Sequence, residues 1–464
     1  MRIEPGSFRD PDSRVLYTSD GVVRALSARG LEDWRALART SFFPRLMEAG
    51  KVVRTEEAQA NGSLEGVLRG EAAGMLRHER IPFVSYPYEW PFSMLRDAAL
   101  LQLELVAAAL EEGMILKDSS PYNVQFRGSR PVFVDVGSFE ALREGEPWVG
   151  YRQFCMLFLY PLLLCAHEGI DYHPLLRGSL DGIPPAQAAA MLGGMRGGVL
   201  KHVKLHAKLE RRYDDASQRD VKRDLKKAGF NSELIKANVK GLTKLVSGLR
   251  WEPKGSEWSA YGDTCTYTDE DSREKADFVR EAAAARRRAL SWDLGANDGR
   301  YARLAAEHSD TTVAVDIDHL TVDRLYRTLR EEGRDDVLAL VMNLADPSPG
   351  LGWRGRERKR LEERGHPDLV LALALVHHLA ITANVPLAEV VDWLASLGAS
   401  LVVEFPTRED PMVQRLLAGK REGTHDDYAL ETFERLLGDA FEVERRAELQ
   451  GGVRVIFLAH PRGG

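Results

Sequence analysis

The sequence lacks the features that mark a secreted or membrane-spanning protein. Its longest apolar run, FCMLFLYPLLLCA (154–166), is shorter than the roughly 20 residues that a transmembrane helix needs, and it contains a proline. The first residues, MRIEPGSFRDPDSR, contain no apolar segment, so we expect no signal peptide. The three cysteines are too few for a disulfide framework and lack the paired spacing of a metal site. These absences predict a cytoplasmic protein with no membrane partner and no bound metal ion.

Positive and negative residues are also nearly balanced over the chain as a whole, and one segment is an exception. The net charge of the 464 residues is −7, but residues 201–254 contain 15 lysines and arginines against 7 aspartates and glutamates. This basic stretch predicts either contact with an acidic partner, such as nucleic acid or a carrier protein, or a solvated helical face. The length of the chain exceeds that of one ordinary domain, and we expect two or three.

From about residue 290 onward, apolar segments of strand length alternate with amphipathic segments of helical period. The first five are near-continuous runs of Val, Leu and Ala, as expected for parallel strands covered on both faces. The last two are joined only by QGG, which allows a hairpin but not a parallel crossover. The pattern predicts an α/β domain with five parallel strands (289–295, 311–318, 337–344, 368–376 and 399–405) and a terminal antiparallel pair (441–449 and 453–459).

A glycine turn follows the first of these strands in the stretch SWDLGANDGRYARLAAEH. Gly295, Asn297 and Gly299 are spaced G-x-N-x-G, which differs from the G-x-G-x-x-G of dinucleotide sites, and no P-loop lysine follows. Asp293 lies two residues ahead of the first glycine. A carboxylate there would repel a phosphate and attract an ammonium or sulfonium group. The turn therefore predicts a cationic ligand.

The segment DLGANDG (293–299) resembles the first motif of class I S-adenosylmethionine (SAM)-dependent methyltransferases, with Asn297 in place of the middle glycine. The resemblance implies a Rossmann-like seven-stranded fold with SAM as the cofactor. It also implies that Asp316, at the end of the second strand, binds both ribose hydroxyls, with Asp318 as a less favoured substitute. The residues implied to lie near the adenine, at the end of the third strand, are Asn343, Leu344 and Asp346.

The fourth strand ends in two histidines, His377 and His378, at the sheet edge where open parallel sheets bind ligands. A histidine can accept a proton near neutral pH, and Glu404, at the end of the neighbouring strand, is positioned to orient one. The alternative is that the histidines only cap the strand. A metal site of both histidines and Glu404, similar to that of some RNA-end methyltransferases, is less favoured because the other ligands of that pattern are absent.

Two further segments are candidates for the acceptor site. The loop 345–360 contains Trp353 and five arginines or lysines, and predicts either a lid over the cofactor or a solvated surface loop. Tyr261 and Tyr267 precede the C-terminal domain and are positioned either to contact the acceptor or to pack two domains together.

The N-terminal region contains a second pattern, Asp118, Asn123 five residues later, and Asp135 in VFVDVG. This pattern resembles the catalytic and metal-binding loops of kinases, and residues 14–27 suggest a hairpin of a small N-terminal lobe. Leu116 and Lys117 depart from the usual residues before the catalytic Asp, and there is no glycine-rich phosphate loop. The alternatives are a kinase-like scaffold used for binding, a phosphotransferase, and a polar turn with no ligand.

The stretches SYPYEWPFSML, LKDSSPYNVQF, EPWVGYRQFC and LALALVHHLAI resemble a bacterial methyltransferase family, some of whose members are host-specific nodulation proteins. The resemblance implies a SAM-dependent methyltransferase (EC 2.1.1) of specialised metabolism acting on a hydroxyl or amine of a small-molecule or glycan-like acceptor. A kinase-like or bifunctional enzyme and an RNA-binding or RNA-modifying methyltransferase are the alternatives. We expect an α+β, kinase-like domain (1–170), a partly basic helical connection (171–270) and a SAM-binding domain (271–464).

Overall fold

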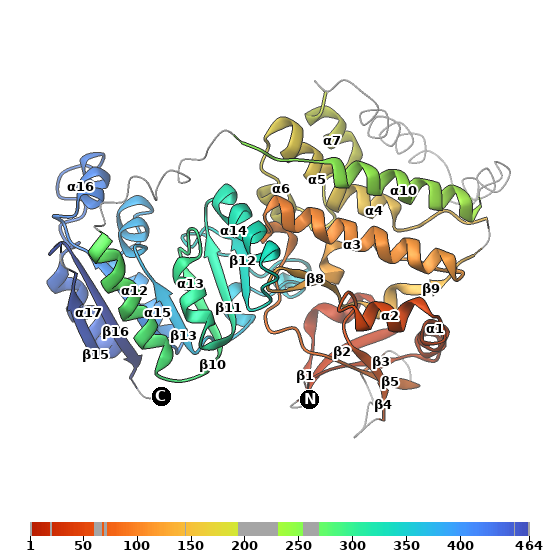
Figure 1. The fold of residues 1–464 in the computed structure, drawn as a ribbon, viewed down its shortest axis with the longest axis horizontal. Coiled ribbons are helices and arrows are strands. Elements are labelled where there is room, and N and C mark those ends of the chain that lie inside the picture. The colour runs from red at the N-terminus through yellow and green to blue at the C-terminus, as the bar shows by residue number, and fades with distance from the viewer. Residues whose placement is uncertain are drawn as a thin grey trace.

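The chain folds into two halves that lie side by side (Figure 1). The structure, a computed structural model, describes residues 2–18, 21–59, 67–68, 72–143, 145–193, 231–253, 269–449 and 451–462. We call residues 2–253 the N-terminal half and residues 269–462 the C-terminal half. No helix within these described ranges is long and apolar enough to cross a bilayer.

The N-terminal half opens with an antiparallel sheet of order β1-β2-β3-β5-β4. Its strands are β1 (Arg2–Ile3), β2 (Ser13–Thr18), β3 (Gly21–Leu26), β4 (Thr55–Ala58) and β5 (Gly74–His78). The predicted hairpin in residues 14–27 is confirmed, because β2 pairs antiparallel with β3. Two helices, α1 (Ala28–Ala38) and α2 (Phe42–Glu48), connect β3 to β4.

A helical layer with two short strand pairs completes this half. Among its helices, α10 packs along α3, so residues 232–248 of the predicted connecting region pack in this half (Figure 1). The strand β6 pairs with β9, and β7 pairs with β8. The elements are α3 (Phe92–Glu111), β6 (Met114–Leu116), β7 (Val124–Arg127), β8 (Arg130–Phe133), β9 (Phe139–Ala141), α4 (Tyr151–Phe154), α5 (Tyr160–Leu163), α6 (His173–Gly178), α7 (Pro185–Met191) and α10 (Ser232–Gly248).

The apolar run at 154–166 forms a buried helix, as predicted. Its α-helical turns α4 and α5 are each followed by a π-helical turn, η5 (Cys155–Leu159) and η6 (Leu164–Glu168). Every residue from Phe154 to Cys165 is buried. Burial in the core accounts for the apolar composition of this run.

The C-terminal half is a seven-stranded sheet of order β12-β11-β10-β13-β14-β16-β15. The first five strands in this order are parallel, and β16 and β15 are antiparallel to their neighbours. The strands are β10 (Arg288–Leu294), β11 (Ser309–Asp316), β12 (Val337–Val341), β13 (Leu369–Ala372), β14 (Ser400–Pro406), β15 (Phe441–Glu448) and β16 (Arg454–Pro461). Each predicted strand overlaps one of these.

Helices cover the sheet and explain its continuous apolar runs. Every residue of β13 and of β14 is buried, as expected for central strands covered on both faces (Figure 1). The helices are α12 (Asp269–Ala284), α13 (Arg300–Ala306), α14 (His319–Glu331), α15 (Leu387–Ser396), α16 (Pro411–Ala418) and α17 (Leu430–Ala440). Because β12, β11, β10, β13 and β14 are parallel, their carboxyl ends meet at one edge of the sheet, where open sheets bind ligands.

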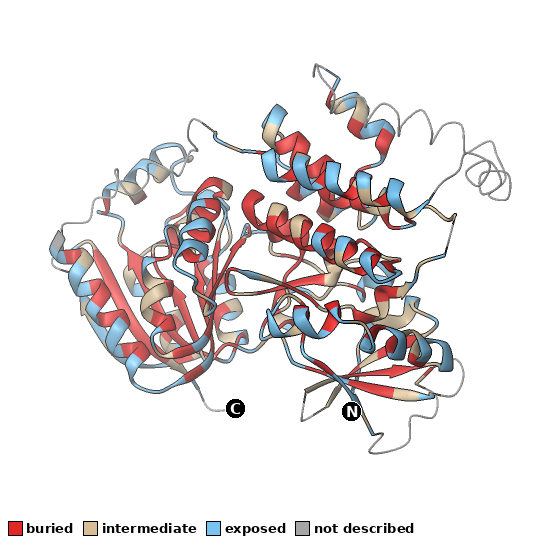
Figure 2. Cartoon of the chain, turned by 45° about the vertical axis from the view of Figure 1, so that its right-hand side comes forward, coloured by how far each residue is buried: buried red, intermediate tan, exposed pale blue. Residues whose placement is uncertain are grey.

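The two halves share one hydrophobic core. Phe83 packs edge-on against Trp292 of β10 with ring centroids 6.0 Å apart. A Cβ atom added at Gly128 would lie 2.5 Å from the backbone of Asp335, so these two backbone segments approach more closely than a residue with a side chain would allow. Buried residues run through the region where the halves meet (Figure 2). This contact resembles the interior of a domain more than a contact between mobile domains.

The first turn of α3 is capped by the other half. Its own N-cap residue, Pro91, has no side chain that can accept a hydrogen bond. Instead, the Phe92 amide donates to Nε2 of His319 at 3.0 Å, and the Ser93 amide donates to Asp323 at 2.7 Å. His319 and Asp323 are four residues apart on α14 and therefore lie on one face of that helix. Because α14 begins three residues after Asp316, this contact is adjacent to the predicted ribose site.

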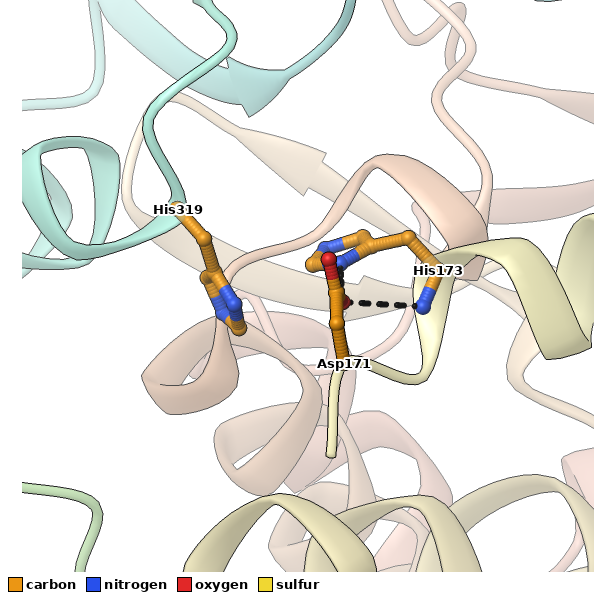
Figure 3. Close-up of side chains that lie close together, drawn as sticks. All are labelled: Asp171, His173 and His319. Atoms are coloured by element: carbon orange, nitrogen blue, oxygen red, sulfur yellow. Dashed lines mark hydrogen bonds and ion pairs between the residues drawn. The ribbon is translucent and has the colours of Figure 1, made fainter. Parts of the chain in front are cut away.

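Asp171, His173 and His319 lie together at this junction (Figure 3), with candidate ligand atoms within 4.8 Å of one another. Nδ1 of His173 contacts Asp171 and its Nε2 lies 2.9 Å from the carbonyl of Trp90, so both nitrogens face oxygen acceptors. Nε2 of His319 already accepts from Phe92. These bonds engage the histidine lone pairs that a metal ion would need, and the bond of His319 to Phe92 joins the two halves.

Replacing His319 with alanine should destabilise the protein by about 1–2 kcal/mol, because the buried Phe92 amide would lose its acceptor. Burial and the neighbouring His173 hold the pKa of His319 well below its ordinary value. The unfolded chain therefore takes up a proton below about pH 6.5 that the folded chain does not, and this contribution is lost as the pH falls. Denaturant titrations at pH 5.5 and pH 7.5 measure both effects.

The matched variant is His319→Gln, whose amide oxygen can accept but does not titrate. We expect it to retain more of the stability than alanine and to remove the pH dependence contributed by His319. Equal stability of wild type and His319→Ala at pH 7.5 would show that the cap contributes nothing.

Candidate active site

The glycine turn after β10 has the backbone conformation that its sequence predicts. Gly295, Asn297 and Gly299 have φ values of 84°, 47° and 76°, in the left-handed region. A Cβ atom at Gly299 would lie 2.6 Å from the side chain of Leu325, so glycine is required there for packing as well. The amides of Gly295 and Ala296 both donate to the Val315 carbonyl at 2.9 Å. The turn is thereby fixed to the end of β11.

Asp316, at the end of β11, lies directly beside this turn. Its carboxylate accepts hydrogen bonds from the amides of Asn297 and Asp318, each at 2.9 Å. Burial raises the pKa of Asp316 above its ordinary value. Asp318, the predicted substitute, is instead the N-cap of α14 and accepts from the Thr321 amide at 3.0 Å. Asp316 is therefore the better placed of the two acids to bind a ligand.

Ile317, between these two acids, was missed by sequence reasoning. Its side chain is 53% exposed, which is unusual for an isoleucine directly after a buried strand. It offers an apolar surface next to the Asp316 carboxylate. The signal in the sequence was an apolar residue between two aspartates at a strand end.

Asp293 is almost completely buried at the end of β10. Among the described residues its Oδ2 atom has no hydrogen-bond partner. Burial raises the pKa of Asp293 to about 7, although the ammonium group of Lys275 acts in the opposite direction. A buried carboxylate oxygen without a donor is costly. The atom is therefore available to a ligand that supplies a donor or a positive charge.

The three residues predicted to lie near the adenine, which follow β12, have different surroundings. Asn343 is exposed, and its Oδ1 accepts from the Ala345 amide at 3.0 Å. Leu344 is half-buried against the core. The carboxylate of Asp346 forms a two-pronged ion pair with Arg177 of the N-terminal half, at 2.8 and 3.0 Å. Asp346 therefore joins the two halves, whereas the Asn343 side chain bonds to the backbone of its own loop.

His377 and His378 lie together beyond the end of β13, where a π-helical turn, η9 (His378–Thr382), begins. Their ring centroids are 4.0 Å apart. His377 is fully buried, and neither ring nitrogen has a hydrogen-bond partner among the described residues. Burial, then His378 and Arg454, hold the pKa of His377 well below its ordinary value, and burial and Arg454 lower that of His378 to about 4. Both rings are neutral at pH 7.

Glu404, predicted to orient a histidine, does not bond to His377, whose ring nitrogens have no partner in the described structure. Its Oε2 accepts from Lys275 at 2.6 Å and its Oε1 from Arg454 at 3.3 Å. The prediction is wrong for His377, since the carboxylate of Glu404 is bound to cations on α12 and β16, and it stays a prediction for His378. Sequence reasoning missed both cations, although Arg454 stands out as a charge beside the apolar strand that follows it.

The loop 345–360 is exposed over residues 352–356 and packed against the N-terminal half in its last part, and its role as a lid stays a prediction. Its second half packs on the N-terminal half: the guanidinium of Arg358 lies 3.9 Å from the ring centroid of Tyr122, and the Lys359 amide donates to Tyr86 at 2.7 Å. Trp353 is 65% exposed, so its role in acceptor binding stays a prediction. Tyr261 and Tyr267 lie outside the described residues.

No protein-family model matches the chain. Nodulation protein NoeA of Rhizobium meliloti (strain 1021) is 34% identical to it over 457 residues, which cover 97% of this chain and 94% of NoeA. The chain belongs to the NoeA family.

Two solved structures that resemble this NoeA-family chain are methyltransferases. N-methyltransferase NodS from Bradyrhizobium japonicum WM9, in complex with S-adenosyl-L-homocysteine, is 13% identical, with 45% of this chain and 94% of NodS covered and a TM-score of 0.33. Magnesium protoporphyrin IX methyltransferase ChlM from Synechocystis PCC 6803, with bound SAM, is 16% identical, with 42% and 80% covered and a TM-score of 0.29.

The kinase-like pattern of this NoeA-family chain is brought together in space. Asp118 precedes η3 (Pro121–Asn123), Asp135 precedes η4 (Val136–Ser138), and Asn123 donates to Ser138 at 3.4 Å. Burial and the nearby Asp135 raise the pKa of Asp118. Arg24, which the sequence did not single out, extends from β3 and forms an ion pair with Asp135 at 2.6 Å. The carboxylate that would hold a metal ion is thus already paired with a cation.

The basic stretch 201–254 is only partly described, since residues 201–230 and 254 lie outside the described ranges. Its helix α10 packs on α3 through Ile235, Val239, Leu242 and Val246. Lys236 on this helix pairs with Glu111 at 3.2 Å. The described part thus has the character of a helix with one packed face and one charged face.

Proposed function

We propose that this NoeA-family chain is a SAM-dependent methyltransferase. One observation carries the proposal: the carboxyl-end edge of the parallel sheet gathers a left-handed glycine turn, an acid at the end of the next strand, and a buried acid with an unbonded oxygen. These groups are Gly295 to Gly299, Asp316 and Asp293. Such an edge is the general ligand site of open α/β sheets.

The chemistry of these residues fits the parts of SAM. A carboxylate such as Asp316 can accept two hydrogen bonds from the vicinal hydroxyls of a ribose. Ile317 offers an apolar surface to a base, and Asn343 is exposed at the end of the next strand. The Oδ2 atom of Asp293 can accept from the ligand's ammonium group. A phosphate would be repelled by both acids, which argues against a dinucleotide.

SAM, when bound, supplies a methyl group already activated by a positively charged sulfur. The protein's own residues then have to orient the acceptor, exclude water and accept a proton. His377, fully buried with two unbonded ring nitrogens, supports this last role, with His378 beside it. The low pKa values of these rings make them weak bases, so we infer that they hold the acceptor's hydrogen and receive its proton as the new bond forms.

We further propose that the acceptor is a hydroxyl or amine of a small-molecule or glycan-like compound. The buried, neutral histidines suit an uncharged hydrogen-bond donor better than a phosphate or carboxylate. Trp353, with Tyr261 and Tyr267, stays a candidate for contacting this acceptor. Glu404 is assigned no contact with it.

The kinase-like cluster supports a structural or binding role rather than phosphoryl transfer. Arg24 neutralises Asp135, the residue that would bind magnesium in a kinase. A metal ion would have to displace a buried guanidinium, which costs an ion pair and leaves a buried charge. We therefore place the chemistry of the chain in the C-terminal half.

Calorimetric titration of the full chain with SAM tests the proposal, and titration with ATP and magnesium tests the alternative. Micromolar SAM binding without ATP binding is the expected result. ATP binding without SAM binding would place the chemistry in the N-terminal half. Tight RNA binding with a steep dependence on salt would instead favour a nucleic-acid partner for the basic stretch 201–254.

SAM binding should strengthen about tenfold between pH 6 and pH 8, because burial raises the pKa of Asp293 to about 7. In the free protein the carboxyl is protonated below this pH, and only the ionised form attracts the ligand's ammonium. Calorimetry across this range measures the change. Asp293→Asn is the control, and its weaker affinity should vary little with pH.

The same variant should be more stable than wild type at pH 8 and equal to it at pH 4. The folded state holds the Asp293 proton up to about pH 7, whereas the unfolded state releases it near pH 4, so wild-type stability falls as the pH rises through this window. Wild-type affinity that is flat from pH 6 to pH 8 would contradict the assigned contact.

A further inference from the structure

A network of four buried charged side chains contacts the loop that leads to the histidines. Lys275 of α12, Glu404 of β14, Arg454 of β16 and Asp410 have side chains that are at most 5% exposed. Lys275 and Glu404 are 2.6 Å apart, Arg454 and Glu404 are 3.3 Å apart, and Arg454 and Asp410 are 2.7 Å apart. Two positive and two negative charges thus alternate along the network.

Glu404 also holds the loop that leads to the histidines. The amide of Ala374 donates to Oε2 of Glu404 at 2.8 Å, the same oxygen that binds Lys275. Ala374 has φ 51°, a left-handed conformation that is unfavourable for a residue with a Cβ atom. It comes two residues after β13 and three residues before His377. An unfavourable backbone conformation persists only where its surroundings impose it.

Lys275 connects this loop to the glycine turn. Its ammonium lies 4.8 Å from the ring centroid of Tyr301, on the helix α13 that the turn opens. It is also close enough to Asp293 to oppose the effect of burial on that carboxyl. One cation therefore contacts both the element that follows the turn and the carboxylate that fixes the histidine loop.

We propose that Glu404, held in place by Lys275, is a positioning residue that fixes the loop 373–378 so that His377 and His378 face the site beside the glycine turn. The assignment rests on the proposed methyltransferase function for its purpose, but the contact itself does not depend on any ligand. For His377 it stands in place of the direct bond that the sequence suggested. Glu404 acts through the Ala374 backbone.

A purely structural role is the alternative, because buried ion pairs can often be replaced by apolar residues without loss of stability. The two roles differ at the Ala374 amide. If the network serves only for stability, the loss of any one of its four charges should loosen the loop 373–378 to a similar extent. A positioning role requires that the loop loosens only when the oxygen bound to Ala374 is removed.

Hydrogen–deuterium exchange of the peptide covering residues 372–379, in the full chain without ligand, tests this difference. Glu404→Leu should speed exchange there about tenfold or more, since a hydrogen bond to a charged acceptor is lost. Glu404→Gln, whose amide oxygen can still accept from Ala374, should keep exchange within a few-fold of wild type. Asp410→Asn is the matched control, because it removes a buried charge of the same network without touching Ala374.

SAM affinity is measured on the same variants. Faster exchange in Glu404→Leu alone, together with weaker SAM binding, is the expected result. Equal exchange in Glu404→Leu and Asp410→Asn, or unchanged exchange in Glu404→Leu, would overturn the proposal. If Glu404→Leu does not fold, the double variant Lys275→Met, Glu404→Gln removes both charges and should leave exchange slow. A wild type that does not bind SAM refutes the methyltransferase while the exchange result still decides the positioning role.

Discussion

Replacing Asp316 with alanine should weaken SAM binding by about 100-fold. The carboxylate is expected to accept two charge-assisted hydrogen bonds from the ribose, each contributing about 1.5–3 kcal/mol, and part of this is recovered by water in the variant. The side chain also accepts from the amides of Asn297 and Asp318, so its loss loosens the turn itself. Calorimetry with SAM measures the change in affinity.

Two variants separate binding from folding in this experiment. Asp310→Asn, near the other end of the same strand, removes an exposed acid that pairs with Arg287 and should leave SAM affinity unchanged. Asp316→Asn retains one oxygen acceptor and should bind with intermediate affinity. If Asp316→Ala binds SAM as tightly as wild type, the ribose site lies elsewhere and the proposed orientation of the cofactor fails.

The parts of the site that the sequence predicted are those whose structure depends on residues close by in the sequence. The glycine turn spans five residues, and its conformation follows from the residues themselves. Asp316 could be located because a strand of Val, Ala and Thr ends there, and parallel strands end at a common edge. The seven strands were predictable for the same reason, since each is a short apolar run bounded by turns.

The parts that could not be predicted depend on residues far apart in the chain. Lys275 reaches Glu404 across 129 positions, and Phe92 reaches His319 across 227. Nothing near Glu404 in the sequence indicates that Lys275 and Arg454 bind its carboxylate. Arg24 likewise lies on a different element from Asp135. Such pairs are fixed by the packing of whole elements, which periodicity does not specify.

The same argument explains the loop 345–360. Its composition of glycine, proline and arginine is typical of a surface loop, and the arginines suggested a ligand. In the structure Arg358 instead stacks on Tyr122 of the other half, and Glu357 pairs with Arg9. The partner surface is formed by the N-terminal half, so the role of the loop could not be read from its own sequence.

Breaking the ion pair between Arg364 and Glu89 should destabilise the chain by about 3–5 kcal/mol, the largest effect we expect from a single substitution. The pair joins the two halves with two bonds of 2.7 Å, and both side chains are at most 1% exposed. The guanidinium also lies 5.1 and 5.0 Å from the ring centroids of Phe83 and Tyr86. Arg364→Met keeps much of this packing but leaves Glu89 buried without its cation.

Denaturant titration of three variants decides whether the lost charge pairing is responsible. Arg364→Met combined with Glu89→Gln should recover most of the lost stability, because neither charge then stays unpaired. Arg9→Gln breaks the ion pair with Glu357. Because the Arg9 side chain is 67% exposed, this change should lower the free energy of unfolding by less than about 1 kcal/mol. A loss in Arg364→Met no larger than in Arg9→Gln would mean that water reaches Glu89, and that the shared core rather than this pair holds the halves together.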